Sequence, residues 1–356
     1  MTLQDIASLR LQNQQLSHPT LTTPAEVVSW FGAMQAQDLF ASLFAIGRRM
    51  SPGATESAIE QTIADKTIAR SWPMRGTIHF APPEDMLWMT KLLAGRIITK
   101  AAGNYRRAEI TPQELTKAGD VFKNILEGTQ LTRHTLYEAL NKAGIDTNGR
   151  NGEQRGMHFI VHWACRGLLC TAPRQGKQQA FTLLKEWLPN NRGLTGDAAI
   201  IELGTRYFAS HGPATFKDFS WWTGLTMTEI KPNISAITKQ LQKISYNGVD
   251  YWHAPRSTAQ QMPEVILLTA FDEYTIAYAD RGAALDTQYA KQLGYGLAPN
   301  ILINGKIAGT WRRTIKKDTV IITPTLTTPL TAQQKTGLQK AAANYAGFLG
   351  LTAVVK

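Results

Sequence analysis

The stretch TPQELTKAGDVFKNILEGTQLTRHTLYEALNKAG, residues 111–144, gives the clearest indication of the fold. It opens with Thr111-Pro112-Gln113-Glu114, which is typical of a capped helix start, and its apolar residues follow helical spacing until Gly128. A second helix begins after Thr132 and stops at Gly144. The pattern therefore predicts two consecutive helices with a short connection.

A third helix and a hairpin are expected directly after this stretch. The helix is expected over residues 153–166, and strands are expected over residues 168–171 and 180–184. The residues Pro173-Arg174-Gln175-Gly176-Lys177 separate the two strands and give the hairpin a basic tip. Three helices followed by a basic hairpin predict a winged helix.

The same order of elements recurs after residue 191. One helix is expected over residues 197–210, and a second is introduced by Thr215, with Asp218 where a capping acid belongs. A third helix begins near residue 228 and is interrupted by Pro232. Strands at 243–246 and 251–253 flank Asn247-Gly248, which predicts a type I′ turn and hence a second wing.

The N-terminal region fits a third, less regular copy. Helices are expected near residues 24–34, 41–50 and 55–65, ahead of strands at 68–72 and 77–81. The hairpin carries charged and aromatic residues that suit an element entering a DNA groove: Arg70, Trp72, Arg75 and His79. The alternative is that Trp72 belongs to the core and the arginines face solvent.

The sequence pattern changes near residue 261 from mainly helical to mainly strand-like. Strands are expected at 265–268, 275–278, 301–303, 307–311 and 319–322, with a helix at 332–347 and an apolar end at 351–355. The sequence therefore predicts an α+β chain of tandem winged-helix units followed by a C-terminal β-rich module. The expected domains are residues 1–110, 111–190, 191–260 and 261–356.

Composition and charge favour a DNA-binding protein. The 356 residues include 38 Lys and Arg against 27 Asp and Glu, a formal net charge of +11, which favours a polyanionic partner such as double-stranded DNA. The spacing of Cys165 and Cys170 matches neither a disulfide framework nor a zinc pair, so we expect a reducing compartment. The sequence has no secretory signal and no membrane-length apolar stretch, so we expect a cytoplasmic, nucleoid-associated protein.

The sequence carries none of the common cofactor or metal motifs. It contains no Walker A sequence, no His-Glu-x-x-His and no Cys-x-x-Cys pair, and we predict neither a cofactor nor a metal. His158 and His162 stand four residues apart, but no nearby carboxylate or thiolate signature accompanies them, so packing or DNA contact is the better interpretation. The acid pair Asp272-Glu273 is open to a catalytic or a structural role.

Four short segments, in order and with compatible spacing, resemble the AlkZ-like family of winged-helix DNA glycosylases. They are Met34-Gln35-Ala36-Gln37-Asp38; Arg75-Gly76-Thr77-Ile78-His79; Phe271-Asp272-Glu273-Tyr274 with Asp280-Arg281; and Asn304-Gly305-Lys306 leading to Gly309-Thr310-Trp311-Arg312. The resemblance runs from about residue 5 to residue 350. It implies a glycosylase that hydrolyses the N-glycosidic bond of alkylated, cationic or cross-linked purines in duplex DNA. An enzyme that acts on a single lesion needs no dyad symmetry, so we expect a monomer with no obligate protein partner and no membrane association.

The resemblance also assigns residues. The catalytic Gln-x-Gln motif of the family corresponds to Gln35 and Gln37. Residues two apart share a side only in an extended segment, so we predict that the helix from Pro24 has ended by Met34. The residues expected to contact DNA are Arg70, Trp72, Arg75, Thr77, His79, Arg174 and Lys177.

Three alternatives to this assignment stay open at this point. The two glutamines could merely bind backbone groups at a helix end. The protein could be a non-catalytic winged-helix DNA-binding protein or transcriptional regulator. A small-molecule binding protein that reuses the scaffold is the third alternative.

Overall fold

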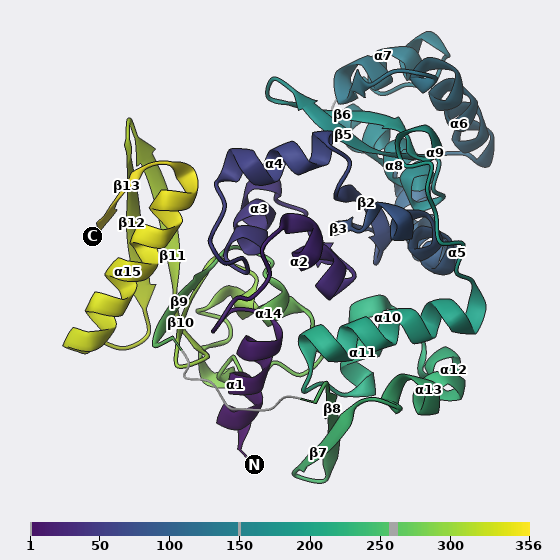
Figure 1. The fold of residues 1–356 in the computed structure, drawn as a ribbon. Coiled ribbons are helices and arrows are strands. Elements are labelled where there is room, and N and C mark those ends of the chain that lie inside the picture. The colour runs from purple at the N-terminus through teal and green to yellow at the C-terminus, as the bar shows by residue number, and fades with distance from the viewer. Residues whose placement is uncertain (1, 149–150, 256–262) are drawn as a thin grey trace. The chain divides into compact units, whose positions relative to one another are not determined.

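The computed structural model describes residues 2–148, 151–255 and 263–356 (Figure 1). The chain divides into two compact units, one formed by Met1–Glu60 with Ile200–Lys356 and the other by Gln61–Ala199. The chain therefore leaves the first unit and returns to it after completing the second. Both units mix helices and strands, so the predicted α+β class is confirmed.

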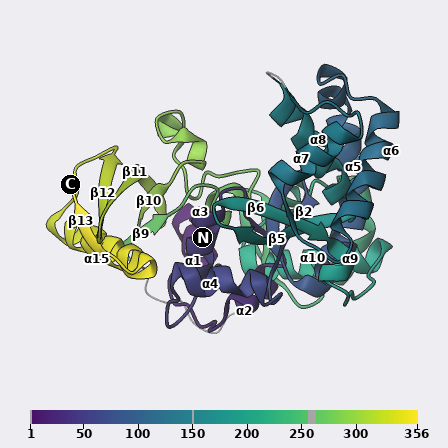
Figure 2. The ribbon, with the colours of Figure 1, turned by 90° about the horizontal axis from the view of Figure 1, so that it is seen from above.

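The second unit contains one long helix, four shorter helices and two hairpins. Its elements are β2 (Ala69–Met74), β3 (Thr77–Ala81), α5 (Pro83–Arg107), α6 (Pro112–Leu126), β4 (Leu131–Thr132), α7 (Arg133–Lys142), α8 (Gly152–Cys165), β5 (Leu169–Gln175), β6 (Gln178–Leu183) and α9 (Leu184–Trp187). The helices α6, α7 and α8 lie next to the β5–β6 hairpin (Figure 2), and β4 pairs with β6. Helices α6, α7 and α8 and the two hairpins lie within a few residues of the predicted elements.

Helix caps explain why α6 and α7 begin where they do. The side chain of Thr111 accepts the N–H of Glu114, and the Glu114 carboxylate accepts the N–H of Thr111, which is the predicted capping box. The side chain of Thr132 accepts the N–H of Thr135 and so caps α7. Local sequence alone therefore fixes these two helix starts.

The first unit contains most of the remaining helices and a second hairpin. Its helices are α1 (Leu3–Asn13), α2 (Pro24–Phe31), α3 (Leu39–Gly47), α10 (Gly196–His211), which crosses the unit boundary, α11 (Phe216–Thr223), α12 (Met227–Ile230) and α13 (Ile234–Thr238). A short 3₁₀ turn at Lys231–Asn233 separates α12 from α13, where Pro232 was expected to interrupt the helix. Strands β7 (Gln242–Tyr246) and β8 (Val249–His253) turn at Asn247 and Gly248, with φ of +46° and +74°. Positive φ at both positions is the signature of the predicted type I′ turn.

The C-terminal part of this unit is a five-stranded sheet covered by one helix. The strand order is β13-β12-β11-β10-β9, with β9 at Val265–Leu268, β10 at Asn300–Ile303, β11 at Lys306–Lys316, β12 at Thr319–Leu326 and β13 at Thr352–Val355. Helix α15 (Ala332–Leu349) lies along one face of the sheet (Figure 1). On the other side, Ile266 and Leu268 of β9 join Leu11 of α1 in a buried apolar cluster. The strands predicted at residues 265–268, 301–303, 307–311 and 319–322 are therefore present.

Three expectations need correction or extension. The strand predicted at residues 275–278 is wrong: Glu273–Ile276 forms the helical turn α14, because Asp272 caps it by accepting the N–H of Tyr274. The β5–β6 turn is tighter than expected, since Pro173 and Arg174 belong to β5. Helices α1 and α5 were not predicted.

Among the described helices, none combines the length and the apolar character needed to cross a bilayer.

Candidate active site

The Gln-x-Gln segment lies outside the helices and begins as a short strand. Helix α2 ends at Phe31, and Gly32 follows with φ of +74°, a conformation that favours glycine. Met34–Gln35 is the short strand β1, and α3 begins only at Leu39. The prediction that the helix ends before Met34 is confirmed.

Burial alternates along this segment. Met34 and Ala36 are buried, at 2% and 0% exposure, whereas Gln35 is half-buried and Gln37 is exposed. Alternating burial is what an extended backbone produces when one side faces the core. The two glutamines therefore lie on the side of the segment opposite to Met34 and Ala36.

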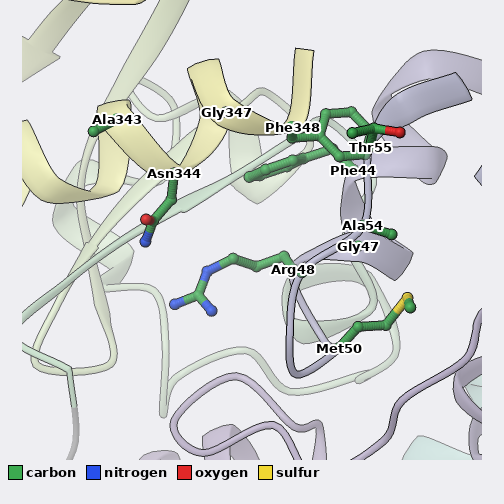
Figure 3. Close-up of a pocket in the computed structure, with 11 residues that line it drawn as sticks. Phe44, Gly47, Arg48, Met50, Ala54, Thr55, Ala343, Asn344, Gly347 and Phe348 are labelled. Atoms are coloured by element: carbon green, nitrogen blue, oxygen red, sulfur yellow. The ribbon is translucent and has the colours of Figure 1, made fainter. Parts of the chain in front are cut away.

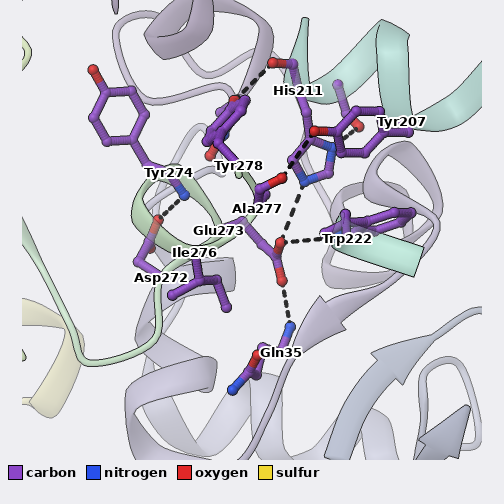
Figure 4. Close-up of polar contacts among 12 residues, drawn as sticks. Gln35, Tyr207, His211, Trp222, Asp272, Glu273, Tyr274, Ile276, Ala277 and Tyr278 are labelled. Carbon is purple, nitrogen blue, oxygen red and sulfur yellow. Dashed lines mark hydrogen bonds and ion pairs between the residues drawn. The ribbon is translucent and has the colours of Figure 1, made fainter. Parts of the chain in front are cut away.

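A buried carboxylate fixes the backbone at the first glutamine (Figure 4). The peptide N–H of Gln35 donates to Oε1 of Glu273 over 2.6 Å. The indole N–H of Trp222 donates to Oε2 of the same carboxylate over 3.0 Å, and Nε2 of His211 lies 3.4 Å from Oε2. Glu273 is 2% exposed, so its charge is balanced by these donors rather than by bulk water.

His211 contacts Glu273 as a neutral imidazole. Burial lowers the pKa of His211, and the neighbouring Glu273 offsets that effect only in part. Because a carboxylate only accepts, the contact with Glu273 places the proton on Nε2, and the Ser210 hydroxyl, which donates to the carbonyl of Arg206, lies 2.8 Å from Nδ1. The ring stacks on Tyr207 with centroids 4.7 Å apart, and this packing holds it in place.

The neighbouring acid, Asp272, is held by an arginine. Both terminal nitrogens of Arg49 donate to the Asp272 carboxylate, over 2.7 Å and 2.9 Å, and one of them also reaches Gln14 over 3.0 Å. The side chains of Arg49 and Asp272 are 0% and 1% exposed. This bidentate pair anchors the turn that carries Glu273, so the acid pair has structural contacts on both members.

The predicted DNA-contacting residues of the β2–β3 hairpin are largely buried. Arg70, Trp72 and His79 are 5%, 3% and 0% exposed, and the Trp72 ring stacks on Phe181 with centroids 6.4 Å apart. The expectation that Trp72 acts as an aromatic wedge therefore needs correction, because its ring is part of the core of the second unit. Arg70 donates to Gln179 over 2.7 Å.

The remaining members of that predicted set are more accessible. Arg75 and Thr77 are half-buried, and one nitrogen of Arg75 lies 3.2 Å from Nε2 of His79. Arg174 is half-buried and Lys177 is exposed at the end of the β5–β6 hairpin. Of the seven predicted side chains, Arg75, Arg174 and Lys177 bring polar groups to the surface, whereas the hydroxyl of Thr77 is buried.

His158 and His162 lie on α8 and pack with an aromatic side chain. Nδ1 of His162 lies 3.2 Å from the Tyr105 hydroxyl, and Nε2 accepts from Arg166 over 3.0 Å. Both rings also pack edge-on against Tyr105. In the described part of the chain, no group of three or more His, Cys, Asp or Glu residues could hold a metal ion.

A cavity of about 360 Å³ lies in the first unit between the end of α3 and α15 (Figure 3). Its lining includes Arg48, which donates to the carbonyl of Leu16 over 3.3 Å, and the aromatic rings of Phe44 and Phe348. Burial, together with the charge of Arg49, lowers the pKa of Arg48 to about 10, so Arg48 stays a cation at neutral pH. Neither glutamine of the Gln-x-Gln segment lines this cavity.

A family profile described as DNA glycosylase AlkZ-like matches residues 28–348, most of the chain. The chain belongs to the AlkZ-like DNA glycosylase family. The resemblance inferred from the four short segments is thereby confirmed, and family membership favours the enzyme over a transcriptional regulator.

The similarity to an AlkZ-like relative extends over nearly the full length. An interstrand DNA cross-link repair glycosylase from Streptomyces sahachiroi is 24% identical over 333 residues, which cover 88% of either chain. The solved structure of the Streptomyces sahachiroi DNA glycosylase AlkZ matches with a TM-score of 0.79 at 20% identity and covers all of both chains. The chain therefore shares the AlkZ fold.

The local sequence pattern identifies the glutamines but not the residues that hold them. Glu273 was noted as an acid with an open role, and Trp222 and His211 were not connected to it. These two residues lie 51 and 62 positions from Glu273 along the chain, and Gln35 lies 238 positions away. Only the folded arrangement brings the four together.

Proposed function

We propose that this AlkZ-like glycosylase hydrolyses the N-glycosidic bond of alkylated or cross-linked purines in duplex DNA, with Gln35 and Gln37 as its catalytic residues. The observation that carries the proposal is the non-helical segment 34–37, in which both glutamines are more exposed than Met34 and Ala36 and the Gln35 peptide is held by Glu273. The cross-link repair activity named for the Streptomyces sahachiroi relative supports this substrate class.

Neutral amides suit the hydrolysis of a base that is already cationic. A purine alkylated at N7 or N3 leaves without a proton donor, because the electron pair of the C1′–N bond neutralises its charge. Positive charge then develops on the sugar, and a water oxygen adds to C1′ and releases a proton. Two amide oxygens can orient this water and stabilise the developing charge, with a smaller desolvation cost than a carboxylate.

Selectivity follows from the same chemistry. Ordinary bases are poor leaving groups without protonation, and the proposed site supplies no general acid from either glutamine. Undamaged DNA would therefore be left intact. Access to C1′ requires lifting the damaged nucleotide or approaching it from the minor groove.

The DNA-binding scaffold is proposed to be a series of winged helices. The helices α6, α7 and α8 with the β5–β6 hairpin support this assignment for residues 111–190. We extend it to residues 1–110 and 191–260, with residues 261–356 as the β-rich module. The side chains proposed to touch DNA directly are Arg75, Thr77, Arg174 and Lys177, while the buried Arg70, Trp72 and His79 support the β2–β3 hairpin.

A base-release assay tests the proposed function. Duplexes carrying N7-methylguanine, a nitrogen-mustard cross-link or a bulky purine adduct are incubated with the protein, and alkali-labile abasic sites are measured. We expect release from at least one of them, and a loss of about a hundredfold on Gln35→Ala or Gln37→Ala. The matched control is Gln333→Ala on α15, an exposed glutamine. If none of the three duplexes yields an abasic product, the proposed function is wrong.

A further inference from the structure

A second cavity of the first unit borders the Gln-x-Gln segment. It has a volume of about 560 Å³ and is lined by Asp38, which directly follows Gln37, and by residues of β11 and of the loop before β10. Buried Trp311 and Tyr345 contribute to its wall, and Lys291, Arg312 and Arg313 bring positive charge to it. The cavity therefore joins the proposed catalytic motif to a basic part of the sheet.

The positive charge of this cavity is not neutralised by the side chains around it. Asp38 is the one acid in the lining, and its carboxylate already accepts the N–H of Ala41 over 3.1 Å. Arg313 donates to the Tyr345 hydroxyl, a neutral partner. Within the described ranges, Lys291 and Arg312 form no ion pair. Three cations against one carboxylate leave a net charge of +2.

The end of β10 opens the edge of β11 beside these cations. The pairing of β10 with β11 ends at Asn300 and Thr310, whereas β11 continues to Lys316. The N–H of Trp311 donates to the carbonyl of Pro299 over 3.1 Å, so odd-numbered N–H groups point to the β10 side. By this alternation, both the N–H and the C=O of Arg313 face the same open edge. A backbone donor thus joins the charged side chains.

A DNA phosphate is the ligand that these donors fit best. Guanidinium, ammonium and peptide N–H groups only donate, and they are the groups that most often contact phosphate oxygens in DNA complexes. A nucleobase or an apolar adduct offers no negative charge to these exposed cations. A phosphodiester supplies both the negative charge and several acceptor oxygens.

We propose that this cavity binds a phosphodiester flanking the damaged nucleotide, with Arg312 and Lys291 as the phosphate ligands. The proposal rests on the proposed function, because it uses DNA as the substrate and Gln37 as part of the motif beside the cavity. Binding here would fix the sugar of the lesion against the two glutamines. Phosphate contacts position a substrate without reading its sequence, so this site is compatible with many sequence contexts.

The test uses binding to a duplex that has no base to release. A tetrahydrofuran abasic analogue is placed in the duplex, and single neutral methylphosphonates replace one phosphate at a time around it. With the unaltered protein we expect one position within about two nucleotides of the analogue to weaken Kd by about tenfold to a hundredfold. With Arg312→Gln or Lys291→Gln, that position should lose its effect while other positions keep theirs.

Two further arms complete the test. Lys335→Gln, an exposed lysine of α15 outside the cavity, should give the profile of the unaltered protein. Inorganic phosphate tests whether the cavity is instead a site for free phosphate. If inorganic phosphate binds the cavity but neither substitution changes the effect of any methylphosphonate position on Kd, the proposal is wrong. The proposal is also wrong if the unaltered protein and both variants give the same methylphosphonate profile. Because the duplex contains no scissile base, this result does not depend on glycosylase activity.

Discussion

The peptide N–H of Gln35 and the Oε1 atom of Glu273 are 2.6 Å apart, although 238 residues separate them in the sequence. Glu273 also accepts from Trp222 and His211, so three donors from three parts of the chain converge on one buried carboxylate. A carboxylate with this many donors holds each of them in a narrow range of positions. Glu273 is therefore a positioning residue for the proposed motif.

We predict that Glu273→Gln slows base release by about tenfold or more while DNA affinity changes little. The carboxamide has only one oxygen, so its NH₂ group would face a donor from Gln35, Trp222 or His211. The Gln35 peptide would then shift, which affects the chemical step more than binding. Single-turnover rates and Kd values for a damaged duplex separate the two effects.

The control for this prediction is Glu127→Gln, an exposed acid at the end of α6. It should leave rate and affinity unchanged. A thermal melt of each variant checks that the fold persists. A folded Glu273→Gln protein with the unaltered rate would show that the carboxylate does not position the motif.

A second prediction concerns the buried pair of Arg49 and Asp272. Replacing Asp272 by Asn leaves a buried guanidinium without its counter-charge, so we expect the free energy of unfolding to fall by about 3–5 kcal/mol. Urea denaturation measures this change. Asp120→Asn, which removes the acid of the exposed Lys123–Asp120 pair, should change stability by less than about 1 kcal/mol. Equal effects of the two substitutions would contradict the structural role of the buried pair.

Much of the fold could be predicted from local sequence patterns. The capping box of Thr111 with Glu114 and the Asn247-Gly248 turn depend on neighbouring residues alone, and both were predicted correctly. Helix α1 was missed although Thr2 and Asp5 form another capping box. For α5, Pro83 at the helix start was a signal that could have been used.

The errors have physical causes beyond local pattern. The β-branched and aromatic residues at 275–278 suggest a strand, but the Asp272 side chain caps a helical turn there. Likewise, the charge around Trp72 suggested a DNA-facing ring, whereas Phe181 of a distant strand covers it. The motif segment could be predicted because its residues are adjacent. Its support by Glu273 could not, because that contact exists only in the folded chain.

A third prediction concerns stability at acid pH. Burial, aided by the charge of Arg166, lowers the pKa of His162 to about 4 from its ordinary 6.5. Between these values the unfolded chain binds a proton that the folded chain excludes. The stabilising contribution is therefore complete above pH 6.5 and is lost as the pH falls toward 4, with a total of up to about 3 kcal/mol.

Urea denaturation at several pH values tests this dependence. His162→Gln should reduce the slope of stability against pH between 6.5 and 4, whatever its effect at neutral pH. His134→Gln is the matched control, because that imidazole is 73% exposed. An unaltered slope in the His162→Gln protein would rule out this residue as the source.

The final prediction concerns the tip of the β5–β6 hairpin. If Arg174 and Lys177 pair with phosphates, each substitution to Gln should weaken binding to damaged and undamaged duplexes alike. The slope of log Kd against log salt concentration should fall by about one for each residue, because fewer counterions are released. Lys142→Gln on α7, an exposed lysine of the same unit, serves as the control. Anisotropy titrations across salt concentrations measure the slopes, and a slope that stays the same in both hairpin variants would remove this hairpin from the DNA-binding surface.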